Sequence, residues 1–247
     1  NDELKVTGQY DIEMQKGEIL ALADTLNVSH EMVDLKSRVN LNAKLKGDKT
    51  TVEGIVTILG GEVHYDMDIK TFSSDSDIVN AEELKKKKST PFKDSLVASV
   101  KVNTEKPLNY KTAEADIQAN VDLMIHKVAK GPVSVLGTVE ILKGSSYRFK
   151  NKKFVFKKSA IDFTGDLAKP LLNMVTLYKT TQSEITIHVT GSLANPNLIF
   201  SSIPRMSRKR ILSTILFDTQ DNDQDLSEDD MMNMMGGTIS QSVFSNV

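Results

Sequence analysis

Residues 115–125 read Ala-Asp-Ile-Gln-Ala-Asn-Val-Asp-Leu-Met-Ile, and this stretch decides the fold. Every odd-numbered position is apolar, and every even-numbered position except Met124 is polar. The alternation predicts a β-strand with one apolar face, because successive side chains of a strand point to opposite sides of its sheet. At about 3.3 Å per residue the stretch spans roughly 36 Å, about twice the length of an ordinary strand. A sheet built from such strands presents a wide apolar face, and the use of that face becomes the functional question.

Alternating stretches of the same kind recur up to about Pro204. Their apolar members are Val39, Leu41, Ala43 and Leu45; Val63, Tyr65, Met67 and Ile69; Leu96, Ala98, Val100 and Val102; Val133, Val135, Gly137, Val139 and Ile141; and Ile185, Ile187, Val189, Gly191 and Leu193. Short turn sequences such as Gly47-Asp48 and Gly144-Ser145 separate them, which predicts antiparallel strands joined by turns. Residues 18–37 fit neither the strand period nor the helix period.

Glycines also occur inside the predicted strands, at Gly54, Gly137 and Gly191. A glycine in a strand interior marks a bulge, a bend or the close approach of another group. In a long sheet these positions permit curvature, either around a groove or as the ordinary coiling of a sandwich.

The hydrophobic period changes from two to about 3.6 after Pro204, which predicts helix. Ser207 is placed as the N-cap of the first helix, and Ser227 as the N-cap of a second one with acidic residues in its first turn. The inner face of the first helix consists of Ile211, Leu212, Ile215 and Leu216.

The composition excludes several classes of protein. The 247 residues carry 31 Lys and Arg against 33 Asp and Glu, a net charge of −2, which argues against a general nucleic-acid-binding protein. There is no cysteine, so disulfides and thiol chemistry are excluded. No apolar run approaches the roughly 18 residues of a membrane-spanning helix. Because the chain begins without Met inside a predicted strand, we expect it to be a piece of a longer protein.

The polar residues do not form a pattern typical of a catalytic or metal site. We expect surface positions for the four histidines, which are His30, His64, His126 and His188. The acidic run 221–225 resembles the start of a calcium-binding EF-hand loop, but Leu226 stands where Gly is required and Met232 where Glu is required. We therefore predict no metal, no cofactor and no enzymatic activity.

A basic block precedes an acidic one. Residues 143–158 carry seven Lys or Arg and no acid, whereas residues 218–230 carry seven acids and no base. Aromatic residues alternate with the basic ones between Tyr147 and Phe156. Because alternation places the aromatics on one face and most of the charge on the other, we interpret the basic block as an amphipathic hairpin rather than a nucleic-acid-stacking surface.

Several motifs occur in a fixed order in the second half of the chain. They are Gly144-x-x-Tyr147, Phe154-x-Phe156, Ile161-x-Phe163-x-Gly165, Pro170-Leu171-Leu172-Asn173-Met174, Val189-x-Gly191-x-Leu193-x-x-Pro196 and Met206-Ser207-x-x-x-Ile211-Leu212. In this order they resemble the TamB C-terminal domain family, within the wider AsmA-like group. The resemblance is specific from about Gly131 to Phe217.

This resemblance implies a mainly β fold, an elongated and curved antiparallel sheet called a β-taco, with an apolar groove and short C-terminal helices. We expect the β-taco over residues 1–204, with a flexible Lys- and Ser-rich loop at 73–91, and a helical segment over 205–247. The resemblance also implies a periplasmic protein anchored in the inner membrane by a helix absent from this sequence.

Two roles accompany the family. One is to move phospholipid between the inner and outer membranes, and the other is to support the assembly of autotransporters and other outer-membrane β-proteins together with TamA. The expected partners are therefore phospholipid acyl chains, a TamA-like outer-membrane barrel and unfolded outer-membrane β-proteins, without nucleic acid.

Alternation selects the side chains expected to line the groove. They are Ala115, Ile117, Ala119, Val121, Leu123, Ile125, Val133, Val135, Val139, Ile141, Phe154, Phe156, Ile185, Ile187 and Val189. The first predicted helix supplies a candidate contact surface for a partner protein, formed by Ile211, Leu212, Ile215 and Leu216.

Two other functions stay open. A scaffold or chaperone would bind an extended client strand at the same face or at a sheet edge by β-augmentation, without lipid transport. A secreted β-rich adhesin stalk would also be long and free of cysteine.

Overall fold

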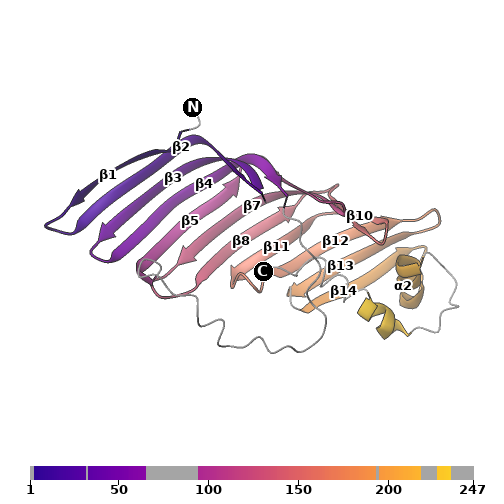
Figure 1. The fold of residues 1–247 in the computed structure, drawn as a ribbon. Coiled ribbons are helices and arrows are strands. Elements are labelled where there is room, and N and C mark those ends of the chain that lie inside the picture. Colours follow the sequence, from indigo (N-terminus) through magenta and orange to yellow (C-terminus); the bar gives the residue numbers. More distant parts are fainter. Residues whose placement is uncertain (1–2, 32, 65–93, 193–194, 218–226, 235–247) are drawn as a thin grey trace.

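The structure is a computed structural model, and it describes residues 3–31, 33–64, 94–192, 195–217 and 227–234. Within these residues, fourteen strands form one sheet and two short helices follow it (Figure 1). The strands are β1 (Lys5–Asp11), β2 (Lys16–His30), β3 (Val33–Lys46), β4 (Lys49–Val63), β5 (Leu96–Thr104), β6 (Leu108–Lys111), β7 (Ala115–Lys127), β8 (Val133–Ile141), β9 (Ser146–Phe149), β10 (Lys152–Phe156), β11 (Ser159–Gly165), β12 (Leu171–Lys179), β13 (Glu184–Ser192) and β14 (Asn195–Ile203). The helices are α2 (Arg208–Phe217) and a second one at residues 228–234. The prediction of a mainly β chain with short C-terminal helices is confirmed.

Two parallel pairings correct the prediction of an antiparallel sheet. β4 pairs with β5 and β6 in parallel, from Thr50 opposite Leu96 to Val63 opposite Tyr110. Alternation of apolar and polar residues shows which face of the sheet a residue occupies, but not the direction of its strand. The sequence pattern therefore could not predict that these strands are parallel. A parallel pair needs a long connection, and residues 64–95 provide it. Most of that connection, including the loop expected at 73–91, lies outside the described residues.

In three places, two strands lie end to end and pair with the same neighbouring strand. β5 and β6 both pair with β4 and β7, β8 and β9 both pair with β7, and β10 and β11 both pair with β12. Beside each interruption a hydroxyl oxygen accepts a backbone N–H from the neighbouring strand at 2.9 to 3.0 Å and lies 3.3 to 3.5 Å from the carbonyl oxygen of the same residue. The three pairs are Thr104 with Val121, Ser145 with Gln118, and Ser159 with Val175. Each hydroxyl therefore supplies an acceptor for a backbone N–H beside the interruption. The Gln118 and Val175 carbonyl oxygens still accept backbone N–H groups, from Leu142 and Lys157, each at 2.8 Å.

The range 18–37, which fits no period, contains a β-bulge. β2 pairs regularly with β3 as far as Ala23 opposite Val39 and resumes at Leu26 opposite Ser37, so β2 carries one extra residue. The extra residue moves the inward positions of β2 from odd to even numbers, which explains why alternation fails here. β4 carries a comparable extra residue between Ile58 and Gly60.

Two glycines inside strands mark a close approach of the neighbouring backbone. Gly54 has φ +150° and Gly137 has φ +123°. A Cβ atom would lie 2.1 Å from the Asn40 carbonyl oxygen at the first position and 2.2 Å from the Asp122 carbonyl oxygen at the second. Because no side chain fits at these distances, only glycine is compatible with both the dihedral angle and the spacing of the strands.

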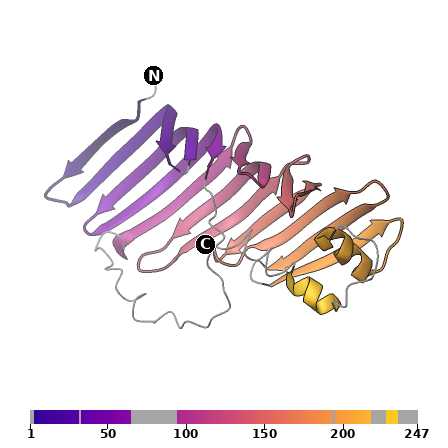
Figure 2. The same ribbon diagram turned by 45° about the vertical axis from the view of Figure 1, so that its right-hand side comes forward.

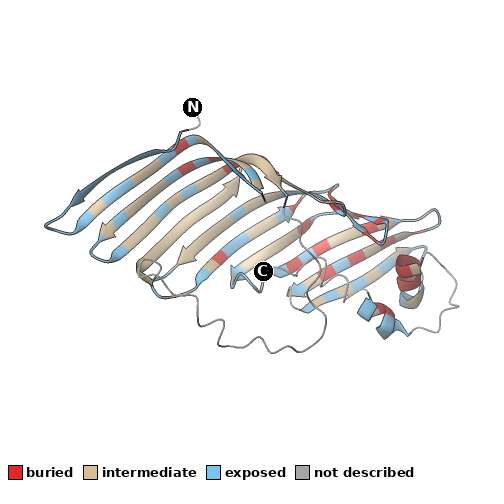
Figure 3. Ribbon diagram, viewed as in Figure 1, coloured by how far each residue is buried: buried red, intermediate tan, exposed pale blue. Residues whose placement is uncertain are grey.

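The most deeply buried side chains lie at the C-terminal end of the sheet (Figure 3). Residues of β8, β10, β12 and β13 pack there with α2 and with Met231 of the second helix. Figures 1 and 2 both place the two helices beside β13 and β14. In β1 to β5, by contrast, the buried apolar residues are Ala23, Val39 and Ile58. Packing is therefore uneven along the sheet.

Candidate functional site

The register of the strands forms one apolar face that crosses the sheet. A single row of opposing residues runs through Leu26, Ser37, Ile58, Thr104, Val121, Val139, Ile161, Leu172, Gly191 and Pro196. This row crosses from β2 to β14. The apolar face is therefore continuous across neighbouring strands rather than confined to one hairpin.

All fifteen residues predicted to line the groove occupy this one face. Register places the members on β7 opposite those on β8, those on β10 opposite β12, and those on β13 opposite β12 as well. The β3 to β5 part of the face carries further aliphatic residues that the prediction did not include, which are Val39, Val56, Val100 and Val102. These residues follow the same alternating pattern in the sequence, so they could have been predicted from it.

Burial divides the apolar face into two parts. The covered part consists of the buried residues Phe154, Phe156, Ile185, Ile187 and Val189, which pack in the C-terminal core. The open part consists of the half-buried residues Val100, Val102, Val121, Leu123, Ile125 and Val139. Val133 at the margin is 47% exposed. Three other predicted groove residues on β7 and β8 are buried: Val135 is 5% exposed, Ala115 is 6% exposed, and Ile141 packs in the C-terminal core.

The four residues predicted as a partner-contact surface are buried in the chain's own core. The exposed fractions are 2% for Ile211, 0% for Leu212 and Ile215, and 5% for Leu216. An isolated amphipathic helix looks the same in sequence whether it packs on its own sheet or on another protein. Here the sheet supplies the apolar partner, so at most 5% of any of these four residues is exposed.

The amphipathic hairpin predicted from the basic block is confirmed. β9 and β10 pair antiparallel, with Tyr147 opposite Phe154. Lys150 and Asn151 form the two-residue turn, both at positive φ of 47° and 64°. Lys152 is the one basic residue of these two strands that does not lie on the charged face of the hairpin. It lies on the aromatic face and is buried.

The opposite face of the sheet is mainly polar, with exposed apolar residues at Ile55, Leu136, Leu171 and Ile199. A shallow depression of about 250 Å³ lies on it between β7, β8 and β11, lined in part by Asn120, Asp122 and Glu140.

His30, His64 and His188 are exposed, as predicted, and His126 is half-buried. Among the described residues, no group of three or more His, Asp or Glu side chains is placed to hold a metal ion, and the acidic run 221–225 lies outside them.

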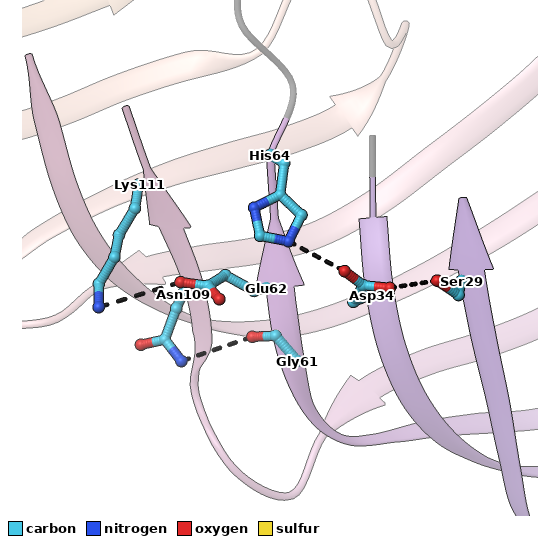
Figure 4. Close-up of polar contacts among 7 residues, drawn as sticks. All are labelled: Ser29, Asp34, Gly61, Glu62, His64, Asn109 and Lys111. Atoms are coloured by element: carbon cyan, nitrogen blue, oxygen red, sulfur yellow. Dashed lines mark hydrogen bonds and ion pairs between the residues drawn. The ribbon is translucent and has the colours of Figure 1, made fainter. Parts of the chain in front are cut away.

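A network of polar contacts connects strand ends at one side of the sheet (Figure 4). Asp34 on β3 accepts a hydrogen bond from the Ser29 hydroxyl, and its other carboxylate oxygen lies 3.1 Å from Nε2 of His64 just after β4. The Ser29 hydrogen bond, followed by that of His64, lowers the pKa of the Asp34 carboxyl below its ordinary value. In the same region, Nζ of Lys111 on β6 lies 3.9 Å from Oε1 of Glu62 on β4. These contacts join β2, β3, β4 and β6.

The fold and this surface define a class: a large β-sheet protein whose distinguishing feature is a long aliphatic face, with a helix packed over one end. The model of the TamB C-terminal domain family matches residues 1–247, and the chain belongs to that family. The match includes the N-terminal region, which the sequence motifs did not cover. No curated protein matches the chain.

Membership in the TamB family gives the chain a place in the cell envelope and a role in outer-membrane assembly within the translocation and assembly module. Within the described residues, neither helix has the length and apolar character needed to cross a membrane.

Proposed function

We propose that the chain is part of a periplasmic bridge that moves phospholipid between the inner and outer membranes beside a TamA-like barrel. Acyl chains lie against the open part of the apolar face, and the sheet curves around them. The proposal involves no catalytic step. The observation that supports it best is the open part itself, where aliphatic residues from several strands are aligned by register yet remain only half-buried.

The energetic reason for such a face is the cost of exposing lipid to water. Two acyl chains carry about 32 methylenes, and each costs about 0.8 kcal/mol in water, so free transfer would cost on the order of 25 kcal/mol. A continuous aliphatic surface removes most of that cost, because the methylenes exchange one apolar environment for another.

The dimensions of the open part suit an acyl chain. The open part lies on β5, β7 and β8, and the face continues beside it through Val56 on β4 and Val39 on β3, so from β3 to β8 there are four steps between neighbouring strands. At about 4.8 Å per step they span about 19 Å. One leaflet of a bilayer provides an acyl chain with about half of the roughly 30 Å hydrocarbon core.

Photo-crosslinking tests the proposal with adjacent residues of one strand. Val121 and Asp122 are neighbours on β7, but Val121 lies on the apolar face and Asp122 on the polar one. A photoreactive amino acid at Val121 should form adducts with phospholipid, identified by mass spectrometry, whereas the same group at Asp122 should not. Val121→Arg should abolish lipid capture with the thermal unfolding transition preserved. A probe at Val121 that labels no lipid in an assembly-competent protein would refute the proposal.

One observation favours a second function, a scaffold for extended client strands. Within the described part of the chain, β14 pairs with β13 alone and so forms an edge of the sheet. An edge strand with unpaired backbone groups can accept an unfolded outer-membrane β-protein by β-augmentation. Photo-crosslinks from β14 to client polypeptide, lost on proline substitution in β14, would support this function over lipid transport.

A further inference from the structure

α2 is enclosed on more than one side. All six residues from Ile211 to Leu216 are buried, although they point around the whole circumference of the helix. The apolar ones pack with the sheet, and Ser213 lies against the second helix, with its Oγ 3.6 Å from the sulfur of Met231. Met231 itself has no exposed surface. α2 is therefore seated between the sheet and a second helix rather than attached loosely to the surface.

Contacts at its two ends show that α2 lies across the strands. At its start, the Arg208 guanidinium lies 5.7 Å from the centre of the Phe200 ring on β14. At its end, the ring of Phe217 lies 5.9 Å from Nζ of Lys150 in the turn between β9 and β10. Ten helical residues extend about 15 Å. The three steps from β14 through β13 and β12 to β10 cover about 14 Å, so the length of α2 matches the distance it crosses.

The surface beneath α2 belongs to the same apolar face as the open part. Register connects Val139 to Ile161, Ile161 to Leu172 and so to β13. Beneath α2 the face becomes aromatic, with the rings of Phe154 and Tyr178 5.1 Å apart. An acyl chain that moved along the face from β7 toward β13 would therefore meet a different surface, already occupied by the side chains of α2.

We propose that α2 is an end stop for the apolar site. It confines bound acyl chains to the open part and excludes them from the surface over β12 to β14. This inference rests on the proposed lipid-carrying function and adds a boundary to it: lipid leaves the site before reaching the C-terminal strands, not by running past them.

The test compares two half-buried positions on the same apolar face. Val121 lies in the open part, and Leu198 on β14 packs against the core that contains α2. The full chain, with a photoreactive amino acid at one or the other position, is incubated with vesicles of palmitoyl-oleoyl phosphatidylglycerol. We expect the yield of lipid adduct at Leu198 to be at least tenfold lower than at Val121. Equal yields would overturn the end stop while leaving the proposed function intact, whereas no adduct at Val121 would refute the proposed function.

A helix variant tests whether α2 causes the exclusion. Leu212→Asp combined with Ile215→Asp places charge between α2 and the sheet. The yield of lipid adduct at Leu198 should then rise toward the yield at Val121. Arg210→Asp adds an acid on the exposed side of α2 and should leave the Leu198 yield low. A Leu198 yield that stays low in the double variant, with the Val121 adduct retained, would contradict a role for α2.

A tethered variant covers the case in which the double variant does not fold. The chain contains no cysteine, so Phe200→Cys and Arg208→Cys introduce the two thiols that a short bismaleimide can bridge. If α2 is a stationary stop, the tether should leave the Val121 adduct unchanged and the Leu198 adduct low. Loss of the Val121 adduct on tethering would show that α2 must move for lipid to enter, and would overturn the inference.

Discussion

Gly137→Ala tests how closely β7 and β8 approach each other in the open part of the apolar face. Gly165 on β11 provides a matched control, because its φ of +131° is close to the +123° of Gly137. A Cβ at Gly137 would lie 2.2 Å from the Asp122 carbonyl oxygen. The nearest atom to a Cβ at Gly165 is the Ser134 hydroxyl oxygen, at 3.7 Å. Both variants therefore strain the backbone, and only Gly137→Ala also forces two strands apart.

The magnitudes follow from these two contributions. An L-residue in an unfavourable φ region costs about 1–3 kcal/mol, and this cost is common to both variants. The overlap at Gly137 adds about 1–3 kcal/mol, as overpacking of a close-packed structure does. Gly137→Ala should thus be about 2 kcal/mol less stable than Gly165→Ala. For a chain of this size such a difference lowers the midpoint of thermal unfolding by about 4–8 °C.

Urea and thermal unfolding followed by circular dichroism measure the difference between the two variants. The reasoning would be refuted if Gly137→Ala and Gly165→Ala unfolded at the same midpoint. That outcome would mean that the strands separate without cost, and that the spacing of β7 and β8 does not require glycine.

Three further predictions concern the Ser159 hydroxyl, helix α2 and the Asp34 carboxylate. Ser159→Ala should destabilise the chain by about 1–3 kcal/mol, because it leaves the N–H of Val175 without its hydroxyl acceptor; an unchanged urea midpoint would contradict that role. Leu212→Ala should cost about 2–5 kcal/mol in the free energy of unfolding, since Leu212 is fully buried, and a cost below 1 kcal/mol would show that α2 is loosely seated. The Ser29 hydrogen bond lowers the pKa of Asp34, so the stabilisation it provides is complete above the ordinary pKa of 3.8 and is lost as pH falls through the lowered pKa. The difference in thermal midpoint between the wild type and Asp34→Asn should therefore be present near neutral pH and shrink in acid, and a difference that is constant with pH would contradict this account.

Local chemistry predicts the start of both helices correctly. The Ser207 hydroxyl accepts the N–H of Arg210 at 3.3 Å, and the Ser227 hydroxyl accepts the N–H of Asp230 at 3.1 Å. A cap involves residues three apart in sequence, so its signal is contained in the sequence itself. The same holds for the strand face of β7, where alternation alone assigns each side chain to one side of the sheet.

Signals that depend on a neighbouring strand are absent from the local pattern. The bulge between Ala23 and Leu26 is defined by its register against β3, and the parallel direction of β5 by its register against β4. Nothing in the sequence distinguishes Ser159, whose hydroxyl accepts the backbone N–H of Val175 on β12, from a serine in an ordinary turn.

The sequence by itself determined that this chain forms long strands with one aliphatic face, where each helix starts, and which family it resembles. Only the tertiary structure decided which part of that face is covered. Val121 and Ile187 are both β-branched aliphatic residues at apolar positions of an alternating strand, yet Val121 is half-buried and Ile187 is 5% exposed. The physical reason is that periodicity is a property of consecutive residues, whereas burial depends on which distant element packs above them. Here that element is α2, which lies across strands that end before it begins.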